Sequence, residues 1–200
     1  MHPAAAFRIE DRAALLAFLA ERPFVTLAAA PQGRPLLAHA PLVVRDLPEG
    51  LALDFHLSRN NALAGHVAQG FAAVVASLGP EAYVSPDWYA SADQVPTWNY
   101  VAVEAEGPVA PLDEEATIRL LDDLSAQEEA RLKPKPAWTR GKMSPGRFEA
   151  MLKGIVGARL AVERLEGTFK LSQNKSAEDR AGVVRALAGR PIGGLMEEPS

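Results

Sequence analysis

The 200-residue chain contains no cysteine. Without thiols it cannot form disulfides, thiolate metal sites or a cysteine nucleophile. The absence fits a reducing compartment, and the N-terminal residues lack the basic region and apolar core of a signal peptide. No apolar run approaches the roughly 20 residues that a membrane helix needs. We therefore expect a cytoplasmic protein that does not insert into membranes.

The chain is also not basic, since its formal net charge is −4. Residues 113–131 hold seven acids and two arginines, whereas residues 133–147 hold five basic residues and no acid. We interpret this contrast as a solvated acidic helix face followed by a basic loop. The basic loop is the one feature that favours a nucleic-acid partner, and the overall charge makes specific DNA binding doubtful.

Several catalytic signatures are missing from the sequence. No glycine-rich phosphate loop follows a predicted strand, which argues against dinucleotide-binding and P-loop folds. His39, His56 and His66 do not have the spacing of a metal-binding pair, so we predict no metal site. No G-x-S-x-G elbow is present to select a serine nucleophile.

What the chain does contain is a series of short apolar segments separated by tight turns. Leu51, Leu53 and Phe55 alternate with Ala52, Asp54 and His56, a period of two that is typical of a half-buried antiparallel strand. By such patterns we predict strands over residues 24–30, 36–44, 51–56, 71–77, 97–106, 155–163 and 167–171. Short strands joined by tight turns predict an α+β, mainly β protein: an antiparallel barrel, closed or nearly so, with peripheral helices.

Helices are predicted where capping residues precede an apolar periodicity. We expect them after Asp11, from Ser58 to about Gln69, from Asp113 to about Glu129, from Ser144-Pro145 to Gly154, and from Ser176 to Leu187. Residues 79–96 are predicted to form a long loop, with room for a short strand at Tyr83-Val84, and Gly107-Pro108 to interrupt a strand. The predicted organisation is one domain over residues 1–188 and a flexible tail over 189–200.

Three polar or aromatic segments are candidates for a binding site. The first is His56–Asn61, where Ser58, Arg59 and backbone N–H groups at a helix start would suit a phosphate. The alternative is a capping serine beside a surface arginine. The second is Val95–Tyr100, in which Trp98 and the Asn99 amide could face a flat heteroaromatic ligand, or simply pack within a barrel strand.

The third segment is Lys170–Lys175. Lys170 could neutralise a phosphate or a reduced flavin anion, and three polar side chains follow it closely: Ser172, Gln173 and Asn174. The alternative is a polar connector between a strand and a helix.

These segments give the chain a resemblance to the PaiB-type FMN-binding split-barrel proteins, a family commonly described as negative transcriptional regulators. The resemblance covers residues 1–188. It is carried by six motifs, namely 39–42 (HAPL), 56–62 (HLSRNNA), 85–89 (SPDWY), 95–100 (VPTWNY), 153–157 (KGIVG) and 170–174 (KLSQN). Ser58 and Ala62 depart from the family's alanine and proline, and Ala158 replaces its usual aromatic residue.

The resemblance implies a split barrel whose two subunits bind two FMN molecules at a homodimer interface. In that arrangement Ser58 and Arg59 hold the phosphate, and the strand around Leu37–Ala40 lies along the isoalloxazine ring. The implied cofactor-binding residues are Ala38, His39, His56, Ser58, Arg59, Asn61, Trp98, Asn99, Lys170, Ser172, Gln173 and Asn174. No catalytic residue is implied.

Three functions are compatible with this resemblance. The first is an FMN-binding protein of regulatory or redox character. The second is a DNA-binding regulator. The third is a haem-handling protein or a flavin-dependent oxidoreductase similar to pyridoxamine-phosphate oxidase. A fold alone cannot separate them.

Overall fold

A computed structural model describes residues 4–197 of the chain. It contains eight strands: β1 (Arg8–Ile9), β2 (Phe24–Ala29), β3 (Leu36–Leu47), β4 (Gly50–Ser58), β5 (Phe71–Val84), β6 (Thr97–Pro111), β7 (Ile155–Ala161) and β8 (Arg164–Lys170). The α-helices are α1 (Arg12–Glu21), α2 (Glu114–Arg131), α3 (Arg147–Leu152), α4 (Ala177–Ala186) and α5 (Pro191–Glu197). Short 3₁₀ turns cover Ala5–Phe7, Pro31–Gly33, Ala64–Gln69, Pro86–Trp88 and Arg140–Lys142. Among the described residues, no helix is both long and apolar enough to cross a membrane.

The chain forms two compact units, and each is described by itself. Of the described residues, the first comprises 4–15, 78–104 and 166–197, and the second comprises 16–77 and 105–165. Strands β5 and β6 run through both units. The predicted single domain over residues 1–188 stays a prediction.

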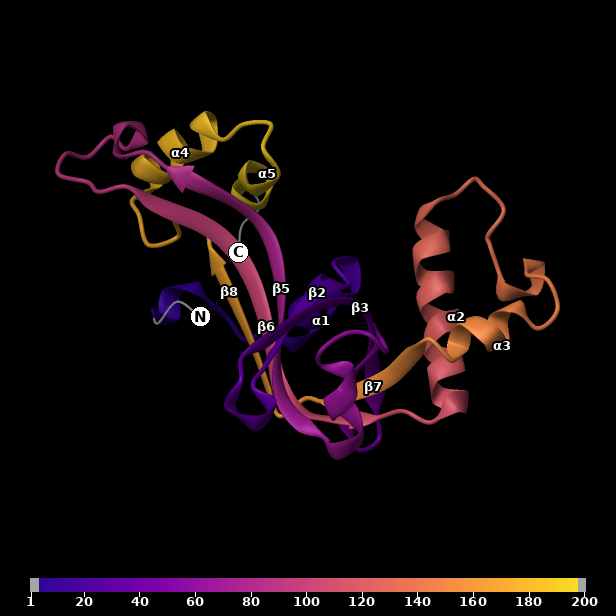
Figure 1. Ribbon diagram of the computed structural model, residues 1–200. Coiled ribbons are helices and arrows are strands. Elements are labelled where there is room, and N and C mark those ends of the chain that lie inside the picture. Colours follow the sequence, from indigo (N-terminus) through magenta and orange to yellow (C-terminus); the bar gives the residue numbers. More distant parts are fainter. Residues whose placement is uncertain (1–3, 198–200) are drawn as a thin grey trace. The chain divides into compact units, whose positions relative to one another are not determined.

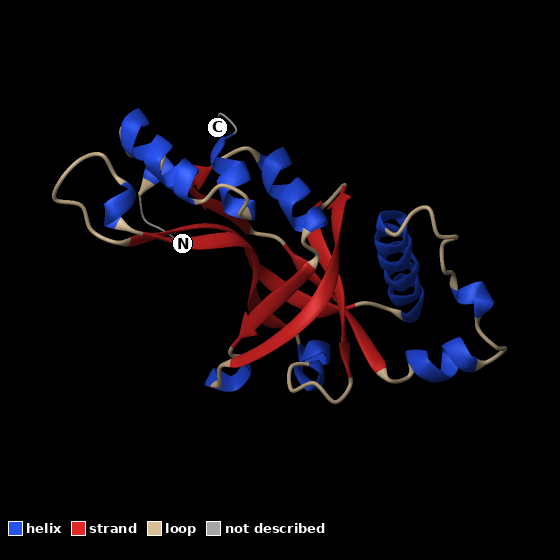
Figure 2. Cartoon of the chain, turned by 90° about the horizontal axis from the view of Figure 1, so that it is seen from above, coloured by secondary structure: helices blue, strands red, loops and turns tan. Residues whose placement is uncertain are grey.

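The second unit contains a closed antiparallel barrel. The strand order β6-β5-β2-β3-β4-β7 is closed by an additional pairing of β6 with β7 (Figures 1 and 2). The predicted fold class, a mainly β split barrel with helices around it, is thus confirmed.

The core of the barrel follows from the alternation of its strands. Leu27 pairs with Ala38 and Val75, Leu53 pairs with Leu160, and Leu160 also pairs with Val109. The exposed fraction of each of these side chains is 3% or less. One face of every strand thus fills the barrel, and the alternate residues face outward.

Helix α2 packs against the outward face of β3, β4 and β7. Asp113 caps it, because its carboxylate accepts from the Ala116 N–H at 2.7 Å. Near the C-terminal end of α2, Gln127 Nε2 donates a hydrogen bond to the Ala20 carbonyl at 2.9 Å, which connects α2 to the end of α1. A long loop leads from α2 to α3 and back to β7 (Figure 1).

In the first unit β1 pairs with β8, and Gly167 of β8 lies so close to Leu15 that a Cβ atom there would be 2.2 Å from the Leu15 side chain. Helix α4 begins as predicted, because the Ser176 hydroxyl accepts from the Asp179 N–H. Asp179 in turn accepts from the N–H and hydroxyl of Ser91, at 2.9 and 2.8 Å. These bonds connect α4 to the loop that follows β5.

Glycine and proline misled the prediction at two strands. The predicted break after residue 77 is wrong, because β5 continues through Gly79-Pro80 to Val84 with Ala82 and Val84 still buried. The predicted break at Gly107-Pro108 is also wrong. Gly107 permits a close approach of β6 to the next strand, since a Cβ atom there would be 1.8 Å from the Ala161 carbonyl oxygen.

Helix boundaries were wrong in three places. No α-helix begins at Ser58, because the Asn61 N–H bonds the Ser58 carbonyl and the Asn61 side chain accepts from Leu63, which favours a turn. Helix α3 begins at Arg147 rather than at Ser144-Pro145. The predicted tail contains α5 instead, with Ile192 and Met196 buried, and residues 198–200 lie outside the described part.

Candidate functional site

The phosphate-binding prediction concerns the turn that follows β4. Ser58, Arg59 and Asn60 are exposed, and Asn61 is half-buried. The Arg59 N–H bonds the Gly154 carbonyl at 2.9 Å, so this backbone group is not available to an anion. The part of the prediction that relied on a helix start is therefore wrong, and the side chains of this turn are the remaining candidates for an anion contact.

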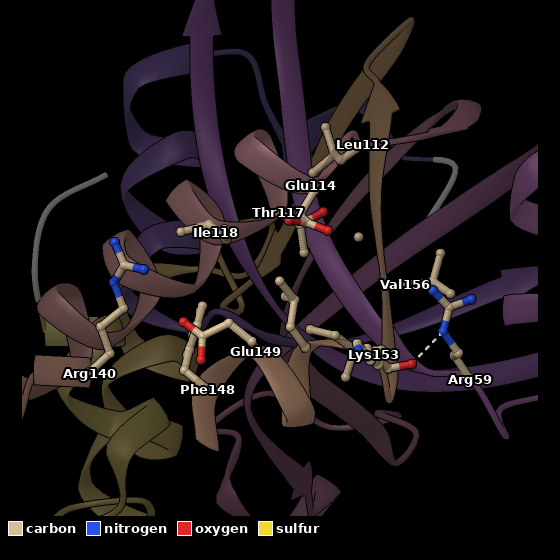
Figure 3. A pocket seen from close by; sticks show the side chains of 13 residues that line it. Arg59, Leu112, Glu114, Thr117, Ile118, Arg140, Phe148, Glu149, Lys153 and Val156 are labelled. Carbon is tan, nitrogen blue, oxygen red and sulfur yellow. Dashed lines mark hydrogen bonds between the residues drawn. The ribbon is translucent and has the colours of Figure 1, made fainter. Parts of the chain in front are cut away.

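Arg59 is held in place through one of its three guanidinium nitrogens. Its Nε donates to the Lys153 carbonyl oxygen at 2.6 Å, the bond drawn in Figure 3. Within residues 4–197 its two Nη groups have no protein partner, and neither does the Asn61 amide nitrogen. A guanidinium fixed at Nε presents its Nη donors in a fork, which is the geometry that a phosphate accepts.

A cavity of about 350 Å³ borders Arg59 (Figure 3). It is lined by residues from the ends of β4 and β6, from α2 and α3, from the 3₁₀ turn between these helices, and from the start of β7: Arg59, Leu112, Glu114, Thr117, Ile118, Arg140, Phe148, Glu149, Leu152, Lys153, Ile155, Val156 and Gly157. Arg59 and Arg140 lie on opposite sides of it in the figure. Because Glu114 and Glu149 also line the cavity, it is of mixed charge, and the most cationic part is the edge formed by Arg59 and Lys153.

A flat and largely apolar surface lies on the outward face of β2 and β3. Phe24 and Leu37 are 68% and 65% exposed, and the Phe24 and His39 rings stack with centroids 6.5 Å apart. The Thr26 hydroxyl lies 3.1 Å from His39 Nδ1. Ala38 points the other way and is 3% exposed, so only its backbone is available from the outside.

His56 also points outward from the barrel, but α2 and α3 cover it. Its side chain is half-buried, and its Nδ1 atom is buried without a hydrogen-bond partner. Burial lowers the pKa of His56 below its ordinary value, because it penalises the charged imidazolium. At neutral pH this side chain is therefore a neutral imidazole.

The remaining predicted residues belong to the first unit, where their contacts are largely internal. Asn99 is fully buried, and its Nδ2 donates to the Ser172 hydroxyl at 2.9 Å. Ser172 adopts a left-handed backbone (φ 60°), which turns the chain after β8. Gln173 stabilises the same turn, since its Oε1 accepts from the Leu171 N–H at 2.7 Å.

Three further residues of this group have different degrees of exposure. Asn174 is exposed, and so is Trp98, whose ring meets that of Tyr83 edge to face at 6.1 Å. Lys170 Nζ donates to the Thr97 hydroxyl and lies over the Phe7 ring. Burial lowers the pKa of Lys170, with a further contribution from the charge of Lys175. The twelve predicted residues thus fall into two groups, one in each unit.

Sequence reasoning missed the residues that α2, α3 and β2 bring to the site. Glu114, Phe148 and Lys153 are far from Arg59 along the chain, and only tertiary structure places them beside it. Phe24 could have been found, because it lies in a predicted strand that a tight turn joins to the predicted strand of His39, and two strands joined in this way commonly pair. The described residues contain no group of three His, Asp or Glu side chains that could hold a metal ion.

The barrel and this surface define an antiparallel split-barrel protein. The solved structures that share the fold include the FAD and heme binding protein from Mycobacterium smegmatis (TM-score 0.61, 18% identity, 87% of this chain and 78% of that one). Another is the flavocytochrome Anf3 from Azotobacter vinelandii (TM-score 0.56, 18% identity, 90% and 78%).

Sequence comparison is more specific. Residues 1–164 match the family described as "Putative FMN-binding domain". The chain is also 30% identical over 181 residues to the protease synthase and sporulation protein PAI 2 of Bacillus subtilis, covering 90% of this chain and 86% of that protein. The chain belongs to this FMN-binding domain family, and the resemblance to the PaiB-type proteins is confirmed.

Proposed function

We propose that the protein binds FMN at a homodimer interface, with Arg59 as the principal phosphate ligand. The observation that carries this proposal is membership of the FMN-binding domain family, together with an exposed guanidinium fixed at Nε and an open apolar face on β2 and β3. When bound, the flavin supplies the hydride or electron chemistry, and the chain supplies binding and orientation.

The residues present are suited to the two ends of FMN. The Arg59 Nη groups, the Ser58 hydroxyl and the Asn61 amide can all donate to phosphate oxygens. The outward row of β3, with His39 next to Phe24 and Thr26, offers a flat surface for an isoalloxazine ring. The pairing of β3 with β4 ends at Leu42 and Phe55, and His39 and Ser58 each lie three residues beyond this pair on their own strands.

The homodimer part of the proposal rests on the exposure of this face. A groove of about 360 Å³ adjoins this face at Leu37 and is lined mostly by small and apolar residues of β2, β3 and β5 and by one acid: Ala28, Ala29, Ala30, Pro35, Leu36, Leu37, Ala72, Ala73, Val74 and Glu106. Contiguous apolar surface of this kind usually marks a contact with another molecule. A second copy of the chain would bury it together with one face of the flavin.

The proposal is tested with Arg59→Ala. A charge-assisted hydrogen bond contributes roughly 1.5–3 kcal/mol, so FMN affinity should fall about ten- to a hundredfold. Riboflavin lacks the phosphate and should bind wild type and variant almost equally. Fluorescence titration with FMN, FAD and riboflavin measures all three affinities, and Arg59→Lys should be intermediate because it keeps the charge and loses the fork.

The matched control is Arg119→Ala. Arg119 is an exposed arginine of α2 in the same unit, paired with Glu115, and this change should leave every flavin affinity unchanged. Unchanged FMN affinity in Arg59→Ala, or an equal loss for riboflavin, would show that Arg59 is not the phosphate ligand.

A further inference from the structure

Two lysines of the first unit, Lys170 at the end of β8 and Lys175 in the turn that follows, are called the lysine pair below. Both side chains are half-buried. Lys170 Nζ donates to the Thr97 hydroxyl and lies 5.7 Å from the centroid of the buried Phe7 ring. A hydroxyl and an aromatic ring are both neutral, so these contacts orient the Lys170 ammonium without cancelling its charge.

The contacts of Lys175 are also neutral. Its Nζ donates to Gln94 Oε1 at 2.7 Å and lies 4.7 Å from the centroid of the Tyr89 ring. The charge of Asp179 acts on Tyr89, but both oxygens of this carboxylate accept hydrogen bonds from Ser91. In the part of the chain that the structure describes, neither lysine of the pair forms an ion pair. The lysine pair is therefore a local positive charge without a protein counter-charge.

This arrangement gives the two amines different chemical properties. Burial lowers the pKa of Lys170, and the charge of Lys175 lowers it further. A lysine that is partly desolvated beside a second cation loses its proton more readily, and the neutral amine is the nucleophilic form. The Lys175 ammonium has three donors and uses one of them on Gln94, so it can still bind phosphate oxygens as a point charge.

We propose that Lys170 is a site of covalent modification by acyl phosphates, with Lys175 binding the phosphate group of the reagent. The neutral Lys170 amine attacks the acyl carbon, and the bond from that carbon to the phosphate oxygen breaks. Inorganic phosphate leaves with the bonding electron pair and takes up the proton that the nitrogen loses, so Lys170 becomes an uncharged amide. The lysine pair belongs to the first unit and Arg59 to the second, and the modification does not depend on flavin binding.

The test treats the full-length protein with acetyl phosphate and, separately, with para-nitrophenyl acetate, a neutral donor of the same acetyl group. The remaining amines are then capped with deuterated acetic anhydride in denaturant, and mass spectrometry gives the acetylated fraction of each lysine as a light-to-heavy ratio. Lys133 and Lys142, two exposed lysines between α2 and α3, are the internal references. With acetyl phosphate, Lys170 should react at least about threefold faster than either reference.

Variants of Lys175 separate phosphate binding from the reactivity of the amine. Lys175→Met should slow acetylation of Lys170 by acetyl phosphate about three- to tenfold, and by the neutral ester less, because only acetyl phosphate has a phosphate group to bind. Lys175→Arg keeps the charge and should leave the ratio of the two rates close to that of the wild type. Lys142→Met removes a lysine of the other unit and should change neither rate. A change in folding or exposure at Lys170 would affect both donors alike.

Inorganic phosphate should protect Lys170 from both donors at concentrations that leave Lys133 reactive. The proposal would be overturned if Lys170 reacted with acetyl phosphate no faster than Lys133 and Lys142, or if Lys175→Met slowed both donors equally. Protection of Lys170 by riboflavin, which has no phosphate, would also overturn it, because it would assign the lysine pair to the flavin ring. The comparison among lysines uses the wild type alone, so it does not depend on the folding of any variant.

Discussion

At the scale of single residues, the most constrained charge in the barrel is Asp54. Its exposed fraction is 1%, and it accepts from Arg45 Nε at 2.9 Å and from Arg159 Nε at 2.6 Å. The hydrogen bond from Arg159 to this carboxylate raises the pKa of Arg159. Arg45 also bonds Asp123 of α2, so a single buried carboxylate connects three strands to the helix that covers them.

Asp54→Ala should therefore lower the free energy of unfolding by about 3 kcal/mol, near the lower end of the range for a broken buried ion pair. A loss near the lower end of this range is expected, because both arginine side chains are partly exposed to water. Arg45 also retains its ion pair with Asp123 in the variant. Urea denaturation measures the loss. Glu115→Gln, which breaks the exposed pair with Arg119, should change the same quantity by less than about 1 kcal/mol. A loss as small for Asp54→Ala would contradict this account.

At the scale of elements, α2 approaches β7 closely because Gly157 has no side chain. A Cβ atom at Gly157 would lie 2.2 Å from the Thr117 hydroxyl oxygen and 3.0 Å from the Thr117 Cβ. The Thr117 hydroxyl cannot easily turn away, because it donates to the Asp113 carbonyl at 2.7 Å. The pairing of His56 with Gly157 places this contact directly beside the His56 position.

Gly157→Ala should destabilise the protein by about 1–3 kcal/mol through overpacking. In a Thr117→Ala background, Gly157→Ala should lower the free energy of unfolding by less. The alanine at position 117 lacks the hydroxyl oxygen and the methyl group that an added Cβ atom at Gly157 would contact. The four proteins form a double-mutant cycle that thermal or urea unfolding can close. Gly65→Ala, at a glycine where an added Cβ atom would meet nothing within 4 Å, should be nearly neutral. If the losses in unfolding free energy of the two single variants simply add in the double variant, the clash of the added Cβ atom is not with Thr117.

At the scale of the whole molecule, the exposed face of β2 and β3 accounts for the proposed dimer. Phe24 and Leu37 expose about two thirds of their surface at positions where the strand alternation directs them outward. Isolated exposed apolar residues need no explanation, but these two lie on neighbouring, paired strands, and Leu37 also lines an apolar groove.

Wild type should therefore sediment as a dimer at micromolar concentration, and Leu37→Asp should shift it toward the monomer. A charge there would have to be buried without a partner in the interface, which costs several kcal/mol. Arg119→Asp, at an exposed residue of α2 that does not line the groove, is the control and should leave the dimer intact. A monomeric wild type would remove the homodimer from the proposed function without affecting the Arg59 test.

Much of this protein could be predicted from its sequence because the relevant physics is local. Alternating apolar residues define the strands, and Asp11, Asp113 and Ser176 cap helices through bonds to N–H groups only two or three positions along the chain. The family motifs likewise identify Arg59 and its neighbours as candidates. Glycine and proline were less informative, since Gly79-Pro80 and Gly107-Pro108 lie within strands that tertiary packing keeps continuous.

Only the tertiary structure decided which groups meet in space. Nothing within the sequence near Arg59 indicates that Lys153 fixes its Nε, because the two residues are joined by strand pairing rather than by proximity in the chain. The burial of His56 Nδ1 depends in the same way on distant elements, because residues of α2 and α3 line a cavity together with His56. Local patterns determine the elements, whereas the contacts between distant elements determine which polar atoms remain free to bind a ligand.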